Sequence, residues 1–387
     1  MWQIFFRFLT LGLVSFGGPA AHIGYFRQTF VNDLNWLDDK HYGSLVALSQ
    51  VMPGPGSSQV GFGIGYHRGG LLGGLAAFIG FTLPSFLLLF VLAISSAQWL
   101  DSDLFQGVIH GLKLLAVVVV ADAIWIMFNQ FCEDHLAKVL MVVSAILLLL
   151  SPTLVMQTSL LVLAAIVGAM CLSLDNKRPI SPNQTGKPLA YGWLISFAVL
   201  FIIALVAMQT DTKLAVLFGQ FYQAGSLVFG GGHVVLPLLE SAVGGAVGSD
   251  RFLTGYALAQ AVPGPMFSLA AFLGAELLQE SPLIGAIVAT LAIFLPGFLL
   301  MLTALRSWDT LNSKPKIIGA LAGINACVVG FLIAAFYNPV FSSAVSSLQD
   351  LIIVVLGFTC LKLLKPNILL LLIGFITAGV LPLVVRY

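Results

Sequence analysis

Charged residues are scarce in this chain. Asp, Glu, Lys and Arg make up 9% of its 387 residues, whereas a soluble domain carries roughly 25%. The formal net charge is +1, so the chain lacks the basic face that nucleic-acid binding requires. Its four cysteines lie far apart, without the short spacings of metal sites. These absences argue against a soluble protein and a nucleic-acid partner, and they predict no metal and no cofactor.

Hydrophobic residues are abundant instead, at 59% of the chain, with a mean hydropathy of +1.02. The apolar runs are long, and the alternating strands of about ten residues that build membrane barrels are absent. We therefore expect an all-α polytopic membrane protein embedded in a lipid bilayer. Runs of about 17–25 residues can cross a bilayer, and the sequence contains about thirteen candidates. They include 3–20, 42–66, 104–130 and 252–278.

Five features recur in the same order with offsets between 210 and 214, which predicts an internal repeat. Gln50–Pro55 returns as Gln260–Pro265, and Phe16-Gly17-Gly18 returns as Phe229-Gly230-Gly231. The other anchors are Leu83–Leu88 with Leu295–Leu300, Gly111 and Val117 with Gly323 and Val329, and Pro152 with Pro366. We expect a first repeat at 1–174, a linker with one connecting helix at 175–212, and a second repeat at 213–387.

Equivalent segments lie seven spans apart, and an odd number inverts the second repeat relative to the first. Most of the 17 Lys and Arg residues then fall on the side of the N-terminus. Basic loops mark the cytoplasmic side, so we expect a cytoplasmic N-terminus and an external C-terminus. The repeat also pairs the first apolar run with a segment in mid-chain. We therefore interpret it as a membrane span rather than a cleaved leader.

Several motifs resemble those of the chromate ion transporter (CHR) family. In the first half they are F-G-G-P-A-A-H-I-G-Y-F-R, A-L-S-Q-V-M-P-G-P-G-S-S-Q-V-G and F-T-L-P-S. In the second half they are F-G-G-G-H, Q-A-V-P-G-P and F-L-P-G. The resemblance covers both halves, as in a full-length two-domain member. It implies secondary transport of an oxyanion across the bacterial inner membrane, with chromate efflux as the named activity and sulfate as a structural mimic.

The paired Pro-Gly-Pro motifs predict where an anion binds. Proline cannot continue a helix, and broken membrane helices mark substrate sites in transporters. A restarting helix offers free N–H groups and about half a positive charge. The candidate residues are Pro53, Gly54, Pro55, Ser57, Ser58 and Gln59, with Pro263, Gly264, Pro265 and Ser268 in the second copy. The alternative is a proline kink whose serines bond to backbone carbonyls. Gln50 and Gln260 could bind substrate or satisfy the freed backbone.

Further candidates lie outside these motifs. Gly17, Gly18, Gly230 and Gly231 mark either more breaks near the substrate or close helix packing. His22 and His233 could each donate to the anion or carry a proton, although they do not superpose in the repeat. Lys113 and Asp122 are half a turn out of phase on one helix, so each needs a partner elsewhere. Both are candidates for ion coupling. Glu276 lies near a segment end, where a solvated anchor is expected.

The two copies differ in polarity. Ser57 and Gln59 correspond to Phe267 and Leu269, whereas Ser58 corresponds to Ser268. We therefore expect the first half to carry most of the substrate chemistry. No ATP-binding motif occurs, so the expected energy source is an ion gradient, with the proton as coupling ion. A sulfate transporter and a non-transporting membrane subunit remain alternatives, and a homodimer is left open. An enzyme is not expected, because no catalytic triad emerges.

Overall fold

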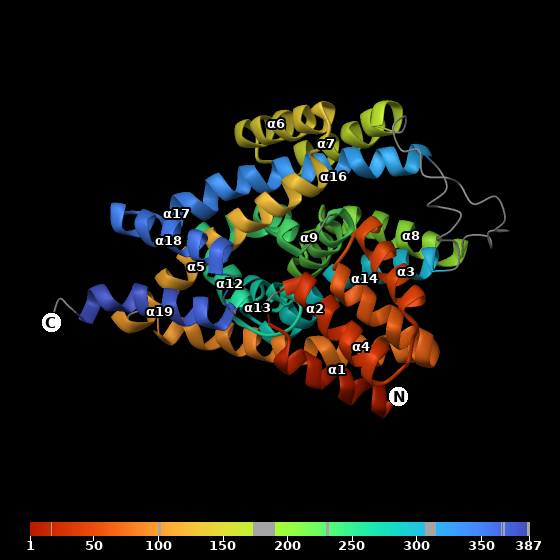
Figure 1. Cartoon of the computed structure of the whole chain (residues 1–387), viewed down its shortest axis with the longest axis horizontal. Coiled ribbons are helices and arrows are strands. Elements are labelled where there is room, and N and C mark those ends of the chain that lie inside the picture. The colour runs from red at the N-terminus through yellow and green to blue at the C-terminus, as the bar shows by residue number, and fades with distance from the viewer. Residues whose placement is uncertain are drawn as a thin grey trace.

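The computed structural model describes residues 1–16, 18–99, 102–172, 190–229, 232–305, 315–364, 366 and 368–384. These residues form helices and no strands, which confirms the all-α class (Figure 1). Five helices are long and apolar enough to cross a membrane, and several shorter apolar helices accompany them.

The helices fall into two sets around α8 (Tyr191–Ala207). The first set is α1 (Trp2–Val14), α2 (Gly18–Phe26), η1 (Arg27–Asp33), α3 (Asp39–Val51), α4 (Gly56–Trp99), α5 (Asp103–Phe131), α6 (His135–Leu150), α7 (Leu154–Val167) and η2 (Gly168–Leu172). The second set is α9 (Lys213–Leu227), η3 (Gly232–Val234), α10 (Val235–Leu239), η4 (Glu240–Gly244), α11 (Gly245–Val247), α12 (Ser249–Ala261), η5 (Met266–Ser268), α13 (Leu269–Leu277), α14 (Pro282–Ala304), α16 (Pro315–Ala335), η6 (Phe336–Phe341), α17 (Ser342–Ala344), α18 (Leu348–Leu364) and α19 (Ile368–Val384).

Several elements of the first set have a counterpart at a similar offset in the second. Helices α3 and α12 each contain 13 residues and begin at Asp39 and Ser249, 210 residues apart. The π-helices η1 and η4 begin at Arg27 and Glu240, 213 residues apart. Helices α5 and α16 begin 212 residues apart, at 103 and 315. The repeated sequence motifs therefore correspond to repeated helices.

Both Pro-Gly-Pro motifs form the tips of helical hairpins. Helix α3 runs antiparallel to the first part of α4, residues 56–68. The rings of His41 and His67 lie 5.9 Å apart at the base, and Leu45 packs against Gly63 halfway along. Each arm of about 13 residues is about 20 Å long, whereas the hydrocarbon core is about 30 Å thick. Segment 42–66 therefore enters and leaves on one side, and the same holds for 252–278. The count of thirteen spans is not confirmed.

The chain reverses again at Gly69 and Gly70. Gly70 has φ +61° and ψ −155°, a backbone conformation open essentially to glycine alone. The second part of α4, residues 71–99, then packs back on the first, with Gly73 against the Gly65 carbonyl. Helix α1 and the α2–η1 arm form a further hairpin, because Phe8 stacks on Phe30 with ring centroids 4.7 Å apart. In the second half, the Nε2 of Gln220 on α9 donates to the Ala242 carbonyl of η4 at 2.9 Å, so α9 and the α10–η4 arm form the equivalent hairpin. Each half thus begins with two short hairpins, followed by longer helices.

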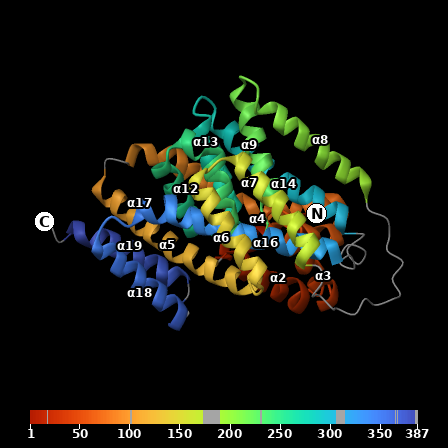
Figure 2. The same ribbon diagram turned by 90° about the horizontal axis from the view of Figure 1, so that it is seen from above.

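The halves exchange their last two helices. Helices α6 and α7 of the first half pack against α16 of the second, and α18 and α19 pack against α5 (Figures 1 and 2). Glycines permit the close approach: Gly323 meets the Ala164 carbonyl, and Gly111 meets the Phe375 carbonyl. The exchange ties the two repeats into one interlocked frame.

The exchanged packing predicts the effect of a glycine substitution. Gly323→Val would drive a Cβ into the Ala164 carbonyl oxygen and the Gly168 backbone. We expect a loss of about 1–3 kcal/mol of stability, as for overpacked cores, measured as a lower melting temperature in detergent. Gly374→Val is the matched control, because no atom lies within 4 Å of its added Cβ. Equal melting temperatures for the two variants would contradict the exchanged packing.

The hairpins also make a prediction about sidedness. The exposed residues Asn35 and Arg68 flank α3 and the first part of α4. A hairpin places both on the same side of the membrane, whereas a spanning 42–66 segment would place them on opposite sides. Asn35→Cys and Arg68→Cys, each in a background without the four native cysteines, should show the same accessibility to an impermeant maleimide. Labelling of one in intact cells and of the other only in inverted vesicles would rule out the hairpin.

Candidate functional site at the hairpin tips

Four hairpin tips meet through reciprocal backbone hydrogen bonds. The N–H of Gly54 donates to the Val228 carbonyl at 2.7 Å, and the N–H of Gly264 donates to the Ser15 carbonyl at 3.0 Å. Ser15 and Val228 are the residues that end α1 and α9, the equivalent helices of the two halves. Each Pro-Gly-Pro tip thus bonds to the helix end of the other half, and such reciprocal contacts are characteristic of two-fold symmetry. The Pro-Gly-Pro motifs of both halves and the ends of α1 and α9 therefore converge on one place.

The tips lie at mid-depth along the longer helices. Gly12, near the end of α1, packs against the Phe81 carbonyl, and Gly225 of α9 packs against the Ile293 carbonyl. Phe81 follows Gly70 by eleven residues, which is about 16 Å of helix. That distance is about half the thickness of the hydrocarbon core. A polar site among the tips would therefore lie near the bilayer midplane.

Glycine is required at the centre of each Pro-Gly-Pro tip. Gly54 has φ +125°, and a Cβ on it would lie 2.7 Å from the Gly297 Cα. Gly264 has φ +106°, and its Cβ would lie 2.9 Å from the Ser85 Oγ. Side chains rarely adopt such φ values, and neither position has room for one. The motif thus allows a sharp reversal and a close approach between the halves.

His22 organises the first-half tip. Its Nε2 lies 3.2 Å from the Ser15 carbonyl and its Nδ1 lies 3.2 Å from the Ser57 Oγ. A carbonyl can only accept a hydrogen bond, so Nε2 carries the hydrogen, and Nδ1 of the neutral ring accepts from the Ser57 hydroxyl. The side chain is fully buried, with its ring edge-on to Phe81 at 5.2 Å.

Hydrogen-bond donors without partners gather where α4 begins. Among the described residues, the Ser58 Oγ is buried and has no partner, and the same is true of the Oγ of Ser15, whose carbonyl accepts a hydrogen bond from His22. Within the same part of the chain, the N–H groups of Gly56, Ser57 and Ser58 have no acceptor. Buried polar groups are normally paired, so these donors are available to water or to a ligand. Hydroxyl and N–H donors at a helix N-terminus suit an oxyanion.

Gln59 has a different role from its neighbours. Its Nε2 donates to the Pro53 carbonyl at 2.9 Å and to the Gly297 carbonyl at 3.0 Å. The side chain therefore satisfies carbonyls at the tip and joins the halves, and its only free atom, Oε1, is an acceptor. Gln50 is exposed at the end of α3, and the Nε2 of Gln260 lies 3.7 Å from the Met266 sulfur. The structure does not bring these glutamines into the cluster of free donors.

The second-half tip is closed and apolar by comparison. The Ser268 Oγ shares a 2.6 Å hydrogen bond with the Ser85 Oγ, and its N–H donates to the Pro265 carbonyl. Phe267 and Leu269 are buried beside it. The difference between the copies that the sequence predicted thus extends to hydrogen bonding, since Ser58 is unpartnered and Ser268 is not.

The two Pro-Gly-Pro hairpins also differ inside. The first encloses a hollow of about 360 Å³ whose polar lining comes from His41, Ser44, Tyr66 and His67. In the second, Arg251 and Glu276 occupy the positions equivalent to His41 and Tyr66. They form a 2.5 Å ion pair with side chains only 16% and 14% exposed. The expectation that Glu276 is a solvated anchor is wrong, because the pairing of distant positions in a hairpin cannot be read from local sequence.

The remaining candidates lie elsewhere. Lys113 pairs with Asp250 of α12, and Asp122 pairs with Lys362 of α18, so both have the separate partners that the sequence required. Gly18 has φ +74° where α2 begins. Gly17, Gly230 and Gly231 lie outside the described residues, as does the side chain of His233.

Two polar residues beside the tips were missed in the sequence: Ser15 and Ser85. Ser85, which bonds to Ser268, could have been found, because the repeated motif reads Leu-Pro-Ser in the first half and Leu-Pro-Gly in the second. Ser15 carries no such signal, since a lone hydroxyl in an apolar helix commonly bonds to its own backbone.

Comparisons with known proteins identify the family. The family model described as chromate transporter matches residues 2–172 and 215–380. An uncharacterized transporter of Methanocaldococcus jannaschii is 30% identical over 97% of this chain and 93% of its own length. A chromate transport protein of Pseudomonas aeruginosa is 29% identical over 85% of this chain and 79% of its own. A probable chromate transport protein of Synechococcus elongatus is 29% identical, with 85% and 81% covered. No solved structure matches the chain. From its two matched parts, the chain belongs to the chromate transporter family.

Proposed function

We propose that the chain exports chromate or a related divalent oxyanion, in exchange for protons, through a site among the four hairpin tips. The observation that carries the proposal is the cluster of unpartnered donors at Gly56, Ser57 and Ser58. Homologous chromate transport proteins supply the substrate class.

The chemistry of the donors suits a transported dianion. Each N–H or hydroxyl gives a directional hydrogen bond, and the start of α4 adds about half a positive charge. No Lys or Arg side chain is among the described groups that contact the Pro53–Gln59 tip. A site without a fixed positive charge attracts the anion without trapping it, which a transporter needs in order to release its substrate.

His22 sets which donors the tip offers to an anion. While its ring is neutral, the Ser57 hydroxyl donates to the Nδ1 of His22, so this hydroxyl is not available to the anion. The donors that remain are the Ser58 hydroxyl and the N–H groups of Gly56, Ser57 and Ser58. A neutral His22 therefore leaves the exchange of protons to another group.

The difference between the two Pro-Gly-Pro hairpins supports alternating access. The first hairpin is hollow toward its base, and the second is sealed by the Arg251–Glu276 pair. We infer that this conformation opens to the side of the first hairpin and is closed on the other. The exchanged helices α6–α7 and α18–α19 hold the halves together, so the moving parts are the tips and their short arms.

The hairpins strengthen the case for a cytoplasmic N-terminus. Arg27 and Lys40, which a spanning 42–66 segment would place outside, return to the side of the N-terminus, while Arg251 moves to the other. The bias of basic residues toward that side therefore grows. Five helices that follow the hairpins (the second part of α4, α5, α6, α7 and α8) separate α1 from α9. Their odd number keeps the second half inverted, and we propose a cytoplasmic N-terminus and an external C-terminus.

Transport by purified protein tests the proposal. Proteoliposomes should take up or release chromate along an imposed gradient, and a pH gradient should change the extent. Competition between sulfate and chromate shows which of the two oxyanions is the substrate. Preferential transport of sulfate, with chromate as a poor competitor, would make sulfate the substrate. A monodisperse protein that moves neither anion would favour a non-transporting subunit and contradict the proposal.

The two serines at equivalent tip positions give a matched pair of variants. Ser58→Ala removes an unpartnered donor, and a hydrogen bond to a charged ligand contributes about 1.5–3 kcal/mol. We expect the KM for chromate to rise by about 10- to 100-fold, since 1.4 kcal/mol is a factor of ten. Ser268→Ala removes only the bond to Ser85 and should leave the KM nearly unchanged, while lowering thermal stability slightly. Equal KM values in the two variants, at matched abundance, would count against the first-half site.

A further inference from the structure

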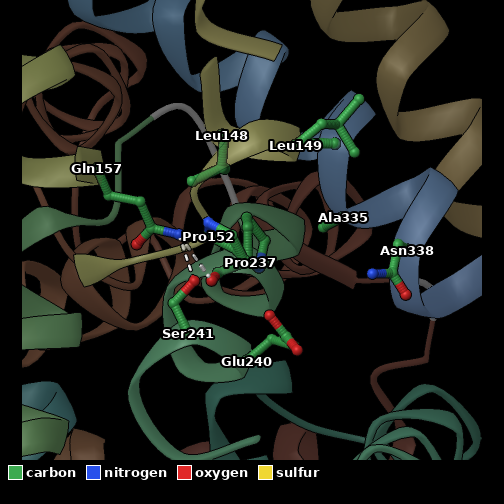
Figure 3. A pocket seen from close by; sticks show the side chains of 10 residues that line it. Leu148, Leu149, Pro152, Gln157, Pro237, Glu240, Ser241, Ala335 and Asn338 are labelled. Atoms are coloured by element: carbon green, nitrogen blue, oxygen red, sulfur yellow. Dashed lines mark hydrogen bonds between the residues drawn. The ribbon is translucent and has the colours of Figure 1, made fainter. Parts of the chain in front are cut away.

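A small pocket away from the hairpin tips contains an ionisable side chain that takes part in none of the ion pairs between the described helices. The pocket has a volume of about 30 Å³, enough for one or two water molecules. Its polar lining consists of Gln157 from α7, Glu240 and Ser241 from η4, and Asn338 from η6 (Figure 3). Figure 3 shows these side chains reaching the same space from three separate elements.

Among the residues that the structure describes, Glu240 has no positively charged partner. It is the sole ionisable side chain that lines the pocket in the part of the chain that the structure describes, and no ion pair or hydrogen bond engages its half-buried carboxyl there. At the equivalent position of the first half, Arg27 pairs with Asp39 at 2.8 Å on the surface. An ionisable side chain inside a membrane segment is a functional candidate, because burying an unpaired charge is expensive.

Ionisable groups on the elements packed against η4 are engaged elsewhere. Lys213 of α9 pairs with Glu280, and the Tyr222 hydroxyl donates to the Phe197 carbonyl. On α12, Asp250 pairs with Lys113, Arg251 pairs with Glu276, and Tyr256 bonds to Gln260. None of the other charged or ionisable residues on the pocket's helices lines the pocket itself. These residues are His135 and Lys138 on α6, Lys316 and Cys327 on α16, and Tyr337 on η6.

The surroundings of the pocket connect Glu240 to the transport machinery. The Nε2 of Gln157, a fully buried side chain, donates to the Pro237 carbonyl at 3.1 Å and to the Ser241 Oγ at 2.7 Å. These bonds tie the arm that carries Glu240 to α7 of the other half, and the Oε1 of Gln157 remains buried without a partner. Helix η4 is π-helical, a form that occurs often at functional sites, whereas η6 is kinked at Asn338, whose φ of −135° and ψ of 117° are not helical. Glu240 follows Gly232, at the tip, by eight residues, about 12 Å of helix.

We propose that Glu240 is the carboxyl that binds and releases the coupling proton. The inference rests on the proposed oxyanion–proton exchange and names the residue that carries it. As a carboxylate, Glu240 keeps its charge only while water fills the pocket, so the arm stays in the conformation that admits water. Once protonated, the neutral carboxyl can be enclosed against Asn338 and α7, and the arm can shift with its tip. Lys113 and Asp122 do not serve this role, since each is held in an ion pair.

Carbodiimide labelling tests the carboxyl without requiring transport. Dicyclohexylcarbodiimide adds the O–H of a protonated carboxyl across its C=N bond, with no leaving group, and the adduct is read by mass spectrometry. We expect labelling of Glu240 that falls as the pH rises, and exposed Glu133 should stay unlabelled. Because the proton and the anion exchange for one another, saturating chromate should slow labelling several-fold. Absence of a Glu240 adduct, or an adduct insensitive to both pH and chromate, would overturn the proposal.

Reconstituted Glu240→Gln tests the coupling itself, with Glu133→Gln as the matched control. We expect Glu240→Gln to move chromate down its concentration gradient while losing all accumulation driven by a pH gradient; Glu133→Gln should accumulate chromate like the wild type. Wild-type accumulation by Glu240→Gln would overturn the proposal, as would a wild-type protein that carries chromate regardless of the pH gradient. If the wild type moves no chromate while labelling of Glu240 still follows pH, the proposed function fails and the protonation site stands.

Discussion

The reciprocal pair of backbone hydrogen bonds at the tips is the constraint on which the rest of the structure depends. A hairpin tip inside a membrane exposes N–H and carbonyl groups that lipid cannot satisfy. Here the N–H of Gly54 meets the carbonyl that ends α9, and the N–H of Gly264 meets the carbonyl that ends α1. Each half therefore completes the other, and neither set of tips could lie at mid-membrane alone. The exchanged helices act in the same way, because α6 and α7 pack against α16 of the second half while α18 and α19 pack against α5 of the first.

Symmetry in the backbone supports asymmetry in the side chains. The two Pro-Gly-Pro tips have the same turn and the same requirement for glycine. The backbone arrangement therefore does not depend on the side chains that come after each turn. The first copy follows its turn with hydroxyls and free N–H groups, and the second with Phe267 and Leu269. The first hairpin is hollow, while the second contains a buried ion pair. In the account given above, one copy binds the anion, the other closes the far side, and Glu240 on a neighbouring arm responds to the proton.

The composition of the sequence predicted an all-α membrane protein. The spacing of motifs along the chain predicted an internal repeat and a site at the Pro-Gly-Pro motifs. It did not predict that the motif reverses the chain. A run such as 42–66 has the apolar length of a span, and only the contacts between His41 and His67 or Leu45 and Gly63 reveal a hairpin. The partners of Lys113 and Asp122 were likewise hidden, because they come from helices more than one hundred residues away. Glu240 looked ordinary for the same reason: what distinguishes it is that no described residue pairs with its carboxyl.

Locating the bound anion tests the central claim most directly. Crystals of the protein grown with chromate would give an anomalous difference map at the chromium absorption edge, which locates the metal of the anion because chromium scatters anomalously there more strongly than any atom of the protein. The account predicts a single strong peak within hydrogen-bonding reach of the Ser58 hydroxyl and the N–H groups of Gly56 and Ser57. A well-occupied peak elsewhere, such as beside His41 and His67 at the base of the hollow hairpin, with none at the tips, would contradict it.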